Sequence, residues 1–227
     1  MNETKKTNYA YLLGAFFITA VLVLMYSVVF ESKDSELPIF NPSDFNPELV
    51  DALVQRNNNH IVSDFSLTNQ NGEKITQADY ENKIYVADFF FTRCPSICPV
   101  MSNNMKKLQD IFANDDDIML LSLSVTPVLD SVPLLKEYAN EHGAIKNKWN
   151  ITTGNKKHIY NLARKSYFAV VEQGDGGLQD FIHTPNFILV DAQKQIRGVY
   201  DGTKDKEIKR IIADIKLLQK RAHKSTN

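Results

Sequence analysis

Residues 84–99 read IYVADFFFTRCPSICP and combine a strongly apolar run with two closely spaced cysteines. The run Ile84–Phe91 is short and apolar throughout, which predicts a strand buried on both faces. Pro99 suits the first turn of a helix, because proline lacks an N–H group that this turn would leave unbonded. Cys94 and Cys98 therefore lie where a buried strand passes into a helix.

Strands and helices alternate on both sides of this junction. Upstream, Val62–Leu67 alternates in polarity, and Asn71-Gly72 favours a hairpin turn with positive φ at both central residues. Downstream, the periodicity predicts strands at Ile118–Val125, Pro185–Val190 and Ile196–Tyr200, and helices at about 100–112, 131–141, 155–166 and 205–220. This order predicts an α/β fold, a thioredoxin-like sandwich with a mainly parallel central sheet, over residues 61–221.

An uncharged apolar segment runs from Tyr9 to Phe30 near the start of the chain. About 20 apolar residues span the hydrocarbon core of a bilayer, so we expect one N-terminal transmembrane helix at about 9–30. A cleaved signal peptide is the main alternative, but its apolar region is usually only ~7–15 residues long. No cysteine stands near the end of the segment, which excludes a lipoprotein anchor.

Charges flanking this segment predict the topology. Lys5 and Lys6 precede it, whereas acidic residues dominate directly after it. Positive charge stays on the cytoplasmic side, so we expect a single-pass membrane protein with a cytoplasmic N-terminus and its domain in the periplasm or an equivalent extracytoplasmic space. The predicted organisation is an anchor at 1–30 that contacts membrane lipid, a proline-interrupted tether at 31–60, the domain at 61–221 and a tail at 222–227.

Composition excludes several classes of function. Lys and Arg number 26 against 27 Asp and Glu, so the chain lacks the basic excess that binds nucleic acid. Hydrophobic residues make up 43% of the chain, which is typical of a globular protein and excludes wholesale disorder. Only 2 cysteines are present in 227 residues, which excludes a small domain held together by disulfides.

The two cysteines can act as a redox pair or as ligands of a soft metal ion. Four residues along a helical path rise by ~6 Å, a Cα separation that a disulfide tolerates. We expect Cys98, close to the helix N-terminus, to have the lowered pKa, because the helix dipole favours a thiolate there. An inert structural disulfide is the alternative in an oxidising compartment.

One histidine of the five is placed to join the cysteines. His183 directly precedes the strand predicted at Pro185–Val190, beside the strand that ends at the cysteines. Pro185 is expected in this same region, in the cis form that is almost confined to X–Pro bonds. The other histidines are expected in the tether, on the domain surface or in the tail: His60, His142, His158 and His223.

These features together resemble the Sco/SenC family of membrane-anchored, thioredoxin-like copper-binding proteins. The resemblance rests on FTRCPSICP at 91–99, on Trp149 followed by Thr153-Gly154, and on His183, and it covers about residues 61–221. It implies that Cys94, Cys98 and His183 bind copper as Cu(I), Cu(II) or both. Two positions differ from the usual family pattern: Ser96 and Thr126 stand where aspartates are common, whereas Asp130 matches a later family aspartate.

Two functions from different classes follow. The first is a metallochaperone, not an enzyme, that delivers copper to the copper-accepting subunit of a membrane cytochrome c oxidase. The second is a membrane-tethered thiol–disulfide oxidoreductase in which Cys94 and Cys98 form the catalytic redox pair, recharged by a thioredoxin-like reductant. A copper-responsive sensor is a further alternative that the sequence leaves open. A thiol peroxidase is disfavoured, because Phe91 stands where a Thr-x-x-Cys pattern requires threonine.

Overall fold

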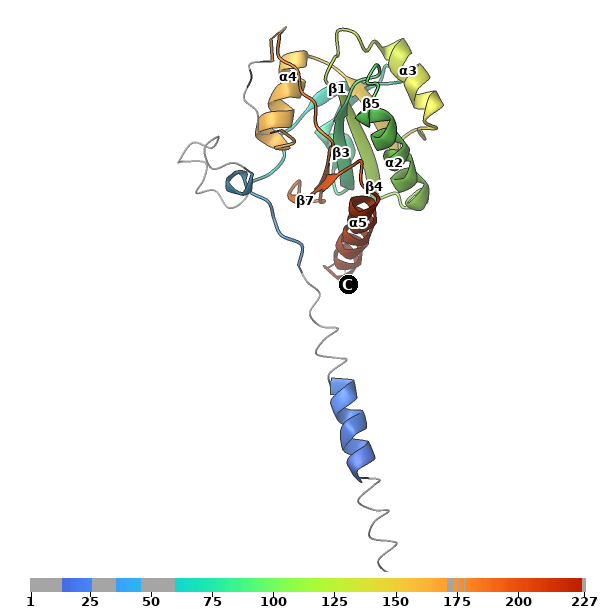
Figure 1. The fold of residues 1–227 in the computed structure, drawn as a ribbon, viewed down its shortest axis with the longest axis vertical. Coiled ribbons are helices and arrows are strands. Elements are labelled where there is room, and N and C mark those ends of the chain that lie inside the picture. The colour runs from blue at the N-terminus through green and yellow to red at the C-terminus, as the bar shows by residue number, and fades with distance from the viewer. Residues whose placement is uncertain are drawn as a thin grey trace, which may run out of the picture. The chain divides into compact units, whose positions relative to one another are not determined.

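The computed structural model describes residues 14–25, 36–45, 60–170, 174, 176–177 and 179–225 (Figure 1). The chain divides into two compact units, Met1–Glu36 and Leu37–Asn227. In the first unit a helix covers residues 14–25, and most of its large apolar side chains are exposed. Among the described residues no helix combines the length and the hydropathy needed to cross a bilayer. Residues 9–13 and 26–30 of the predicted span lie outside the described residues.

One seven-stranded sheet forms the centre of the second unit, with the strand order β2-β1-β5-β4-β3-β6-β7. All seven residues of each central strand, β3 and β4, are buried, as the apolar runs predicted. The strand bounds are β1 Ser66–Asn69, β2 Lys74–Thr76, β3 Ile84–Phe90, β4 Ile118–Ser124, β5 Trp149–Thr153, β6 Asn186–Val190 and β7 Ile196–Asp201.

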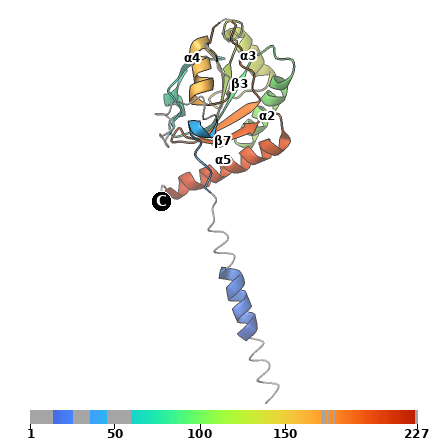
Figure 2. The same cartoon turned by 60° about the vertical axis from the view of Figure 1, so that its left-hand side comes forward.

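Helices cover both faces of this sheet (Figure 1). Successive residues of β3 point to opposite faces, so Val86 packs in one apolar cluster and Ala87 in the other. The first cluster takes in α2 (Ile97–Ile111), α3 (Val132–Glu141) and α5 (Asp205–Ser225), and the second takes in the 3-10 helix η3 (Gln77–Tyr80), α4 (Lys156–Asn161) and the π-helical turn η4 (Leu162–Ser166). Figure 2 shows α5 from another side, where it packs against β7.

The prediction of a mainly parallel sheet is wrong. Only β3–β4 and β4–β5 pair in parallel, whereas β1–β2, β1–β5, β3–β6 and β6–β7 are antiparallel. The reason lies between β5 and β6, where α4 and η4 do not lead directly into the next strand. A single helical crossover would return the next strand in parallel, whereas here more chain separates η4 from β6, and β6 runs antiparallel to β3. The strand β5 itself was not predicted.

Two turns also differ from expectation. In the β1–β2 hairpin, Gly72 has φ of 76°, but Asn71 does not have a positive φ, so the expected turn with two left-handed residues does not form. Instead the Asn69 side chain accepts hydrogen bonds from the N–H groups of Asn71 and Glu73 and closes the loop. No peptide bond among the described residues is cis, so the expectation of a cis Pro185 is wrong.

Residues 37–45, assigned to the tether from the sequence, lie against the domain. The Phe40 N–H donates to the Ile196 carbonyl at 2.9 Å. Arg197, which is buried and paired with Asp191 at 2.8 Å, also donates to the carbonyls of Leu37 and Pro38. This segment therefore packs beside β7.

A carboxyl group lies in the middle of the sheet. Asp88 is 1% exposed and accepts a hydrogen bond from Ser122 at 2.5 Å, and the Trp149 indole donates to the same Ser122 hydroxyl at 2.9 Å. Burial raises the pKa of Asp88 to about 7, because desolvation outweighs the hydrogen bond that favours the charged form. Ionising this group therefore costs folding free energy.

We predict that Asp88→Asn raises the free energy of unfolding, relative to the unaltered chain, more at pH 8 than at pH 4. Because the folded-state pKa is raised, the stability linked to Asp88 is complete below the unfolded pKa of ~3.9 and is lost as the pH rises through 7. The loss in the unaltered chain amounts to up to about 4 kcal/mol, at ~1.4 kcal/mol per pKa unit. Urea unfolding of residues 37–227 at both pH values measures it. The exposed Asp116→Asn is the control, and an equal pH dependence in Asp88→Asn and the unaltered chain would contradict the prediction.

Candidate functional site

The two cysteines are held by the junction of β3 and α2. After β3 ends at Phe90, a tight loop begins, in which the Cys94 N–H donates to the Phe91 carbonyl at 3.2 Å. Helix α2 starts at Ile97, so Cys98 lies inside its first turn. Cys94 is 6% exposed and Cys98 is 2% exposed, and both are free thiols. The loop therefore keeps two reduced sulfurs together beneath the surface.

The helix N-terminus acts on Cys94 and not on Cys98. Burial alone would raise the pKa of Cys94, but the N–H groups of Cys98 and Ser96 and the side chains of Cys98 and His183 hydrogen-bond to its sulfur and lower the pKa to about 6. The Cys98 N–H lies 3.5 Å from that sulfur. At pH 7 Cys94 is therefore mostly a thiolate.

The expectation that Cys98 has the lowered pKa is wrong. Its pKa is raised to about 12, mainly by burial and further by the neighbouring Cys94 sulfur and the charge of Asp88. Cys98 lies within the first turn, and its own N–H donates to the Cys94 sulfur. The resting pair is a thiolate at Cys94 that accepts a hydrogen bond from the Cys98 thiol.

His183 reaches this pair from the segment just before β6, the strand that pairs antiparallel with β3. Its Nε2 lies 4.0 Å from the Cys94 sulfur, although 89 positions separate the two residues. The ring is exposed and stacks against Phe181, with centroids 6.3 Å apart and an interplanar angle of 16°. Phe91, from the cysteine loop, contacts both rings. The structure therefore brings His183 beside Cys94.

These three side chains fit a soft metal ion in chemistry and in part in geometry. A thiolate and an imidazole nitrogen that share one ion, at ~2.3 and ~2.0 Å, lie about 3.5–4.3 Å apart, depending on the angle at the ion. The distance of 4.0 Å between Cys94 and His183 falls in this range. Within the described ranges, however, no cluster of three or more His, Cys, Asp or Glu side chains is arranged to hold a metal. Cys98 would have to lose its proton and turn toward the ion.

Sequence reasoning missed the polar network that supports the cysteine loop. The buried carboxylate of Asp130 accepts hydrogen bonds from the Thr92 N–H, at 3.3 Å, and the Thr92 hydroxyl, at 2.7 Å. Ser124 and Thr126 donate to the same carboxylate. Asp130 thereby ties the loop after β4 to the residue two positions before Cys94. The one sequence signal for this network was that Asp130 matches an aspartate of the Sco/SenC family pattern.

The other histidines do not join the cysteines. His60 lies with its Nε2 2.7 Å from the Ser166 carbonyl and its ring 4.7 Å from that of Phe168, and burial lowers its pKa. His142 packs on Tyr138, and His158 lies on α4. The side chain of His223 lies outside the described residues. Of the four, His60 was expected in the tether but contacts the domain.

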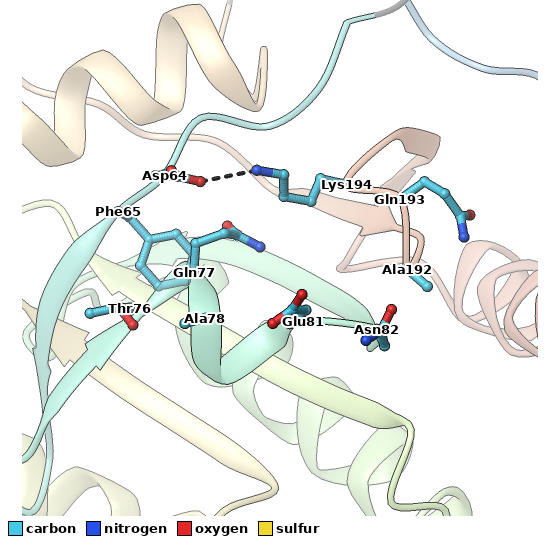
Figure 3. A pocket seen from close by; sticks show the side chains of 10 residues that line it. All are labelled: Asp64, Phe65, Thr76, Gln77, Ala78, Glu81, Asn82, Ala192, Gln193 and Lys194. Atoms are coloured by element: carbon cyan, nitrogen blue, oxygen red, sulfur yellow. Dashed lines mark hydrogen bonds and ion pairs between the residues drawn. The ribbon is translucent and has the colours of Figure 1, made fainter.

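Two of the cavities in the described part of the chain differ in their position relative to the cysteines. A cavity of about 230 Å³ borders His183 and is lined by Phe45, Phe168, Ala169, Val170, Thr184, Asn186 and Val199. A larger one of about 550 Å³ (Figure 3) is bridged by the Asp64–Lys194 ion pair at 3.0 Å. It lies beside the turn after β6, at the opposite end of that strand from His183. The larger cavity is thus separate from the cysteines.

Comparison with known proteins identifies the family. The SCO1/SenC family model matches residues 54–220. The chain belongs to the SCO1/SenC family. It is 32% identical to the SCO1 protein homolog of Bacillus subtilis strain 168 over 160 residues, which is 70% of this chain and 82% of that protein.

Solved structures of family members share the fold. A SCO1/SenC family lipoprotein from Bacillus anthracis matches with a TM-score of 0.62 at 31% identity, over 71% of this chain and 96% of that one. BsSco, described as a member of the Sco family of cytochrome c oxidase assembly proteins with a disulfide switch, matches with a TM-score of 0.60 at 31% identity, over 70% and 94%. Arabidopsis thaliana ScoI with copper bound matches with a TM-score of 0.55 at 26% identity, over 70% and 99%. The fold of this SCO1/SenC member is thioredoxin-like, with a mixed sheet.

We predict that the two thiols differ sharply in reactivity. Cys94 should react with iodoacetamide at pH 7, and its rate should fall as the pH is lowered, with a midpoint near pH 6, because its thiolate is protonated. The reaction of Cys98 should stay slow up to pH 9. Mass spectrometry of modified peptides from the reduced protein measures both rates. Cys98→Ser should leave Cys94 reactive. Faster labelling of Cys98 than of Cys94 would show that the helix end activates the other sulfur.

Proposed function

We propose that this SCO1/SenC protein is a copper metallochaperone that binds copper through Cys94, Cys98 and His183. One observation carries the proposal: the structure places an imidazole nitrogen 4.0 Å from a thiolate that is 89 positions distant in the sequence. A relative of the same fold has been solved with copper bound, which supports the choice of metal. Sulfur and imidazole ligands also favour Cu(I) over hard cations such as Mg²⁺.

Each ligand enters the site in a different state. Cys94 is ready as a thiolate, because its pKa is lowered to about 6. Cys98 releases its proton when the metal replaces it on the sulfur, since ligation and protonation compete for the same lone pair. His183 is exposed and binds through the neutral Nε2 that faces Cys94. Three protein ligands leave one side of the ion open for transfer.

We further propose that the acceptor is the copper-accepting subunit of a membrane cytochrome c oxidase. The support is the description of BsSco as belonging to a family of cytochrome c oxidase assembly proteins. An open fourth position at the metal serves this role, because an incoming ligand can bind before the protein's own ligands leave. A chaperone needs such ligand exchange, whereas a storage site does not.

We propose that residues 9–30 anchor the chain in the membrane, with the N-terminus in the cytoplasm and the domain on the other side. The charges around the segment support this orientation. Within the described part of it, Phe16, Phe17 and Val23 are each more than 60% exposed, so the helix has an unburied apolar surface. In this arrangement residues 31–60 link the anchor to a domain that extends to residue 221, with residues 222–227 as a tail.

The asymmetric cysteines favour a second function, thiol–disulfide exchange with a partner protein. A thiolate at Cys94 attacks a partner disulfide, and the hydrogen-bonded Cys98 thiol can then resolve the mixed disulfide, once it loses its proton, by forming the Cys94–Cys98 bond. The same pair must be returned to the dithiol by a reductant, for which a thioredoxin-like protein is suited. This function needs no histidine ligand, so His183 separates the two proposals.

We predict that His183→Ala lowers the affinity for copper more than about 100-fold, because even groups that only orient a metal ligand are worth ~10–100-fold. Disulfide formation between Cys94 and Cys98 should persist in this variant, whereas Cys94→Ser or Cys98→Ser should abolish both properties. Competition with a chromophoric Cu(I) chelator measures the affinity, and His142→Ala is the matched control. Equal affinity in His183→Ala and the unaltered chain, with full disulfide reduction of a substrate, would favour the oxidoreductase.

We predict that a reporter enzyme fused after Asn227 is active only outside the cytoplasm and stays in the membrane fraction. The physical reason is the uncharged run from Tyr9 to Phe30 with lysines before it and acids after it. Replacing Lys5 and Lys6 with Glu should weaken this orientation. Recovery of a shortened, soluble fusion protein would instead identify the segment as a cleaved signal peptide.

A further inference from the structure

Apolar side chains are exposed around the cysteine loop. Val128 is 82% exposed and Leu129 is 52% exposed, in the loop that follows β4. Phe181, two residues before His183, and Val100, two residues after Cys98, are about half exposed. We call these four residues the apolar rim. Outside residues 14–25, the described part of the chain exposes only three other large apolar side chains, at Ile61, Ile111 and Ile145.

The loop that carries Val128 and Leu129 is firmly fixed. Asp130 accepts four hydrogen bonds from its neighbours, two of them from Thr92 in the cysteine loop. The N–H groups of Leu129 and Asp130 both donate to the Thr126 carbonyl. Because polar contacts on the buried side hold the loop, its two apolar side chains cannot turn inward and remain in water. Exposed apolar patches of this kind mark interaction surfaces.

The other side of the rim is equally anchored. Phe181 packs edge-on against Phe91, with ring centroids 5.3 Å apart, and stacks on His183. Phe91 directly precedes Thr92, so both halves of the rim attach to the same short loop. The rim therefore flanks Cys94 and Cys98 from two sides.

One charge accompanies these apolar groups. Arg93 is exposed beside Cys94, and no ion pair to it is formed among the described residues. Near Phe181, by contrast, the charge of Asp180 is already paired with Arg164 at 2.6 Å. The surface around the sulfurs thus combines apolar and aromatic groups with an unpaired arginine, a composition enriched at protein interfaces. A complementary surface carries apolar side chains and a carboxylate.

We propose that the apolar rim and Arg93 form the docking surface for the polypeptide that receives copper. This inference rests on the function proposed above and names the partner surface of the same site. The sulfurs are almost fully buried, so a polypeptide that offers its own ligands to the copper has to cover the rim to reach them. A polypeptide with an acidic and apolar contact surface does this and presents its own thiolates or imidazoles. A lipid surface would cover the rim without supplying a ligand.

The transfer is a ligand exchange that leaves the oxidation state unchanged. Cu(I) bonds to Cys94, Cys98 and His183 break as bonds to acceptor thiolates or imidazoles form. Of the protons released by acceptor thiols, one is taken up by Cys98, which is a thiol in the resting pair, and any other passes to the solvent. The rim contributes by excluding water and by holding the two sets of ligands close together, which raises the rate of copper exchange.

The test measures the rate at which the full-length chain, in nanodiscs of zwitterionic lipid and loaded with Cu(I), passes copper to two acceptors. One acceptor is the purified apo form of the host's copper-accepting oxidase subunit, and the other is a small water-soluble Cu(I) chelator. The double variant Val128→Ser/Leu129→Ser and the charge reversal Arg93→Glu are compared with Ile145→Ser and Lys74→Glu, which alter exposed residues elsewhere. Bound-copper spectra and the affinity for Cu(I) show that each variant still holds the metal.

We expect the double variant to slow transfer to the polypeptide at least about tenfold, as truncated interface anchors do, with no change toward the chelator. Arg93→Glu should slow the same transfer and reverse its dependence on salt, because attraction to the acceptor's carboxylate becomes a repulsion that salt screens. The controls should match the unaltered chain. Equal transfer by the double variant and the unaltered chain, with copper bound normally, overturns the docking surface and leaves the chaperone intact.

Two other results also overturn the inference. If the unaltered chain binds no Cu(I) at the loading step, the proposed function fails, and the docking surface fails with it. If anionic lipid in the nanodiscs slows transfer by the unaltered chain but not by the rim variants, the rim contacts the membrane instead of a polypeptide.

Discussion

The antiparallel pairing of β6 with β3 is the constraint on which the site depends. Its register sets Tyr85 opposite Val190 and Ala87 opposite Ile188, so β6 begins at the edge of the sheet where β3 ends. Whatever precedes β6 must then lie beside whatever follows β3. His183 and the cysteine loop meet for this reason alone, and the 4.0 Å approach follows from the backbone ladder. Both faces of these strands are buried in apolar clusters, so a shift in register would move the core and the site together.

The start of α2 supplies the second element of the site, its electrostatic asymmetry. The two sulfurs are close neighbours, but only Cys94 receives N–H groups from the helix end, and only it becomes a thiolate at neutral pH. The proton thus stays on Cys98, between a thiolate and the buried Asp88. Like charges disfavour one another at short range, so this assignment avoids a second anion in the same buried volume. A cation bound to both sulfurs would remove that conflict, which favours the soft metal ion of the proposed function.

Much of this arrangement was accessible from the sequence, because it depends on local signals. The apolar runs predicted β3 and β4, and the prolines around the cysteines predicted the passage from loop to helix. Three features were not predicted from the sequence, each for a physical reason. Trp149–Thr153 is too short and too polar to read as a strand, and it is fixed by pairing on both sides with β4 and β1. The direction of β6 depends on the chain between η4 and β6, whose sequence carries no helical or strand periodicity. Which cysteine is activated depends on where one N–H group points, and this is a property of tertiary geometry.

The antiparallel direction of β6 is what the expected approach of His183 to the cysteine loop requires. In a parallel β6 the residues before the strand would lie at the edge of the sheet where β3 begins, far from the cysteines. With β6 antiparallel, His183 lies 4.0 Å from the Cys94 sulfur instead. The strand direction that refutes the predicted mainly parallel sheet is thus a condition for the copper site proposed above. Metal binding and disulfide formation then compete for the same two sulfurs, since a sulfur bonded to a second sulfur has no thiolate to offer a metal. In the proposed function, the redox state of Cys94 and Cys98 thus controls whether His183 has partners with which to bind copper.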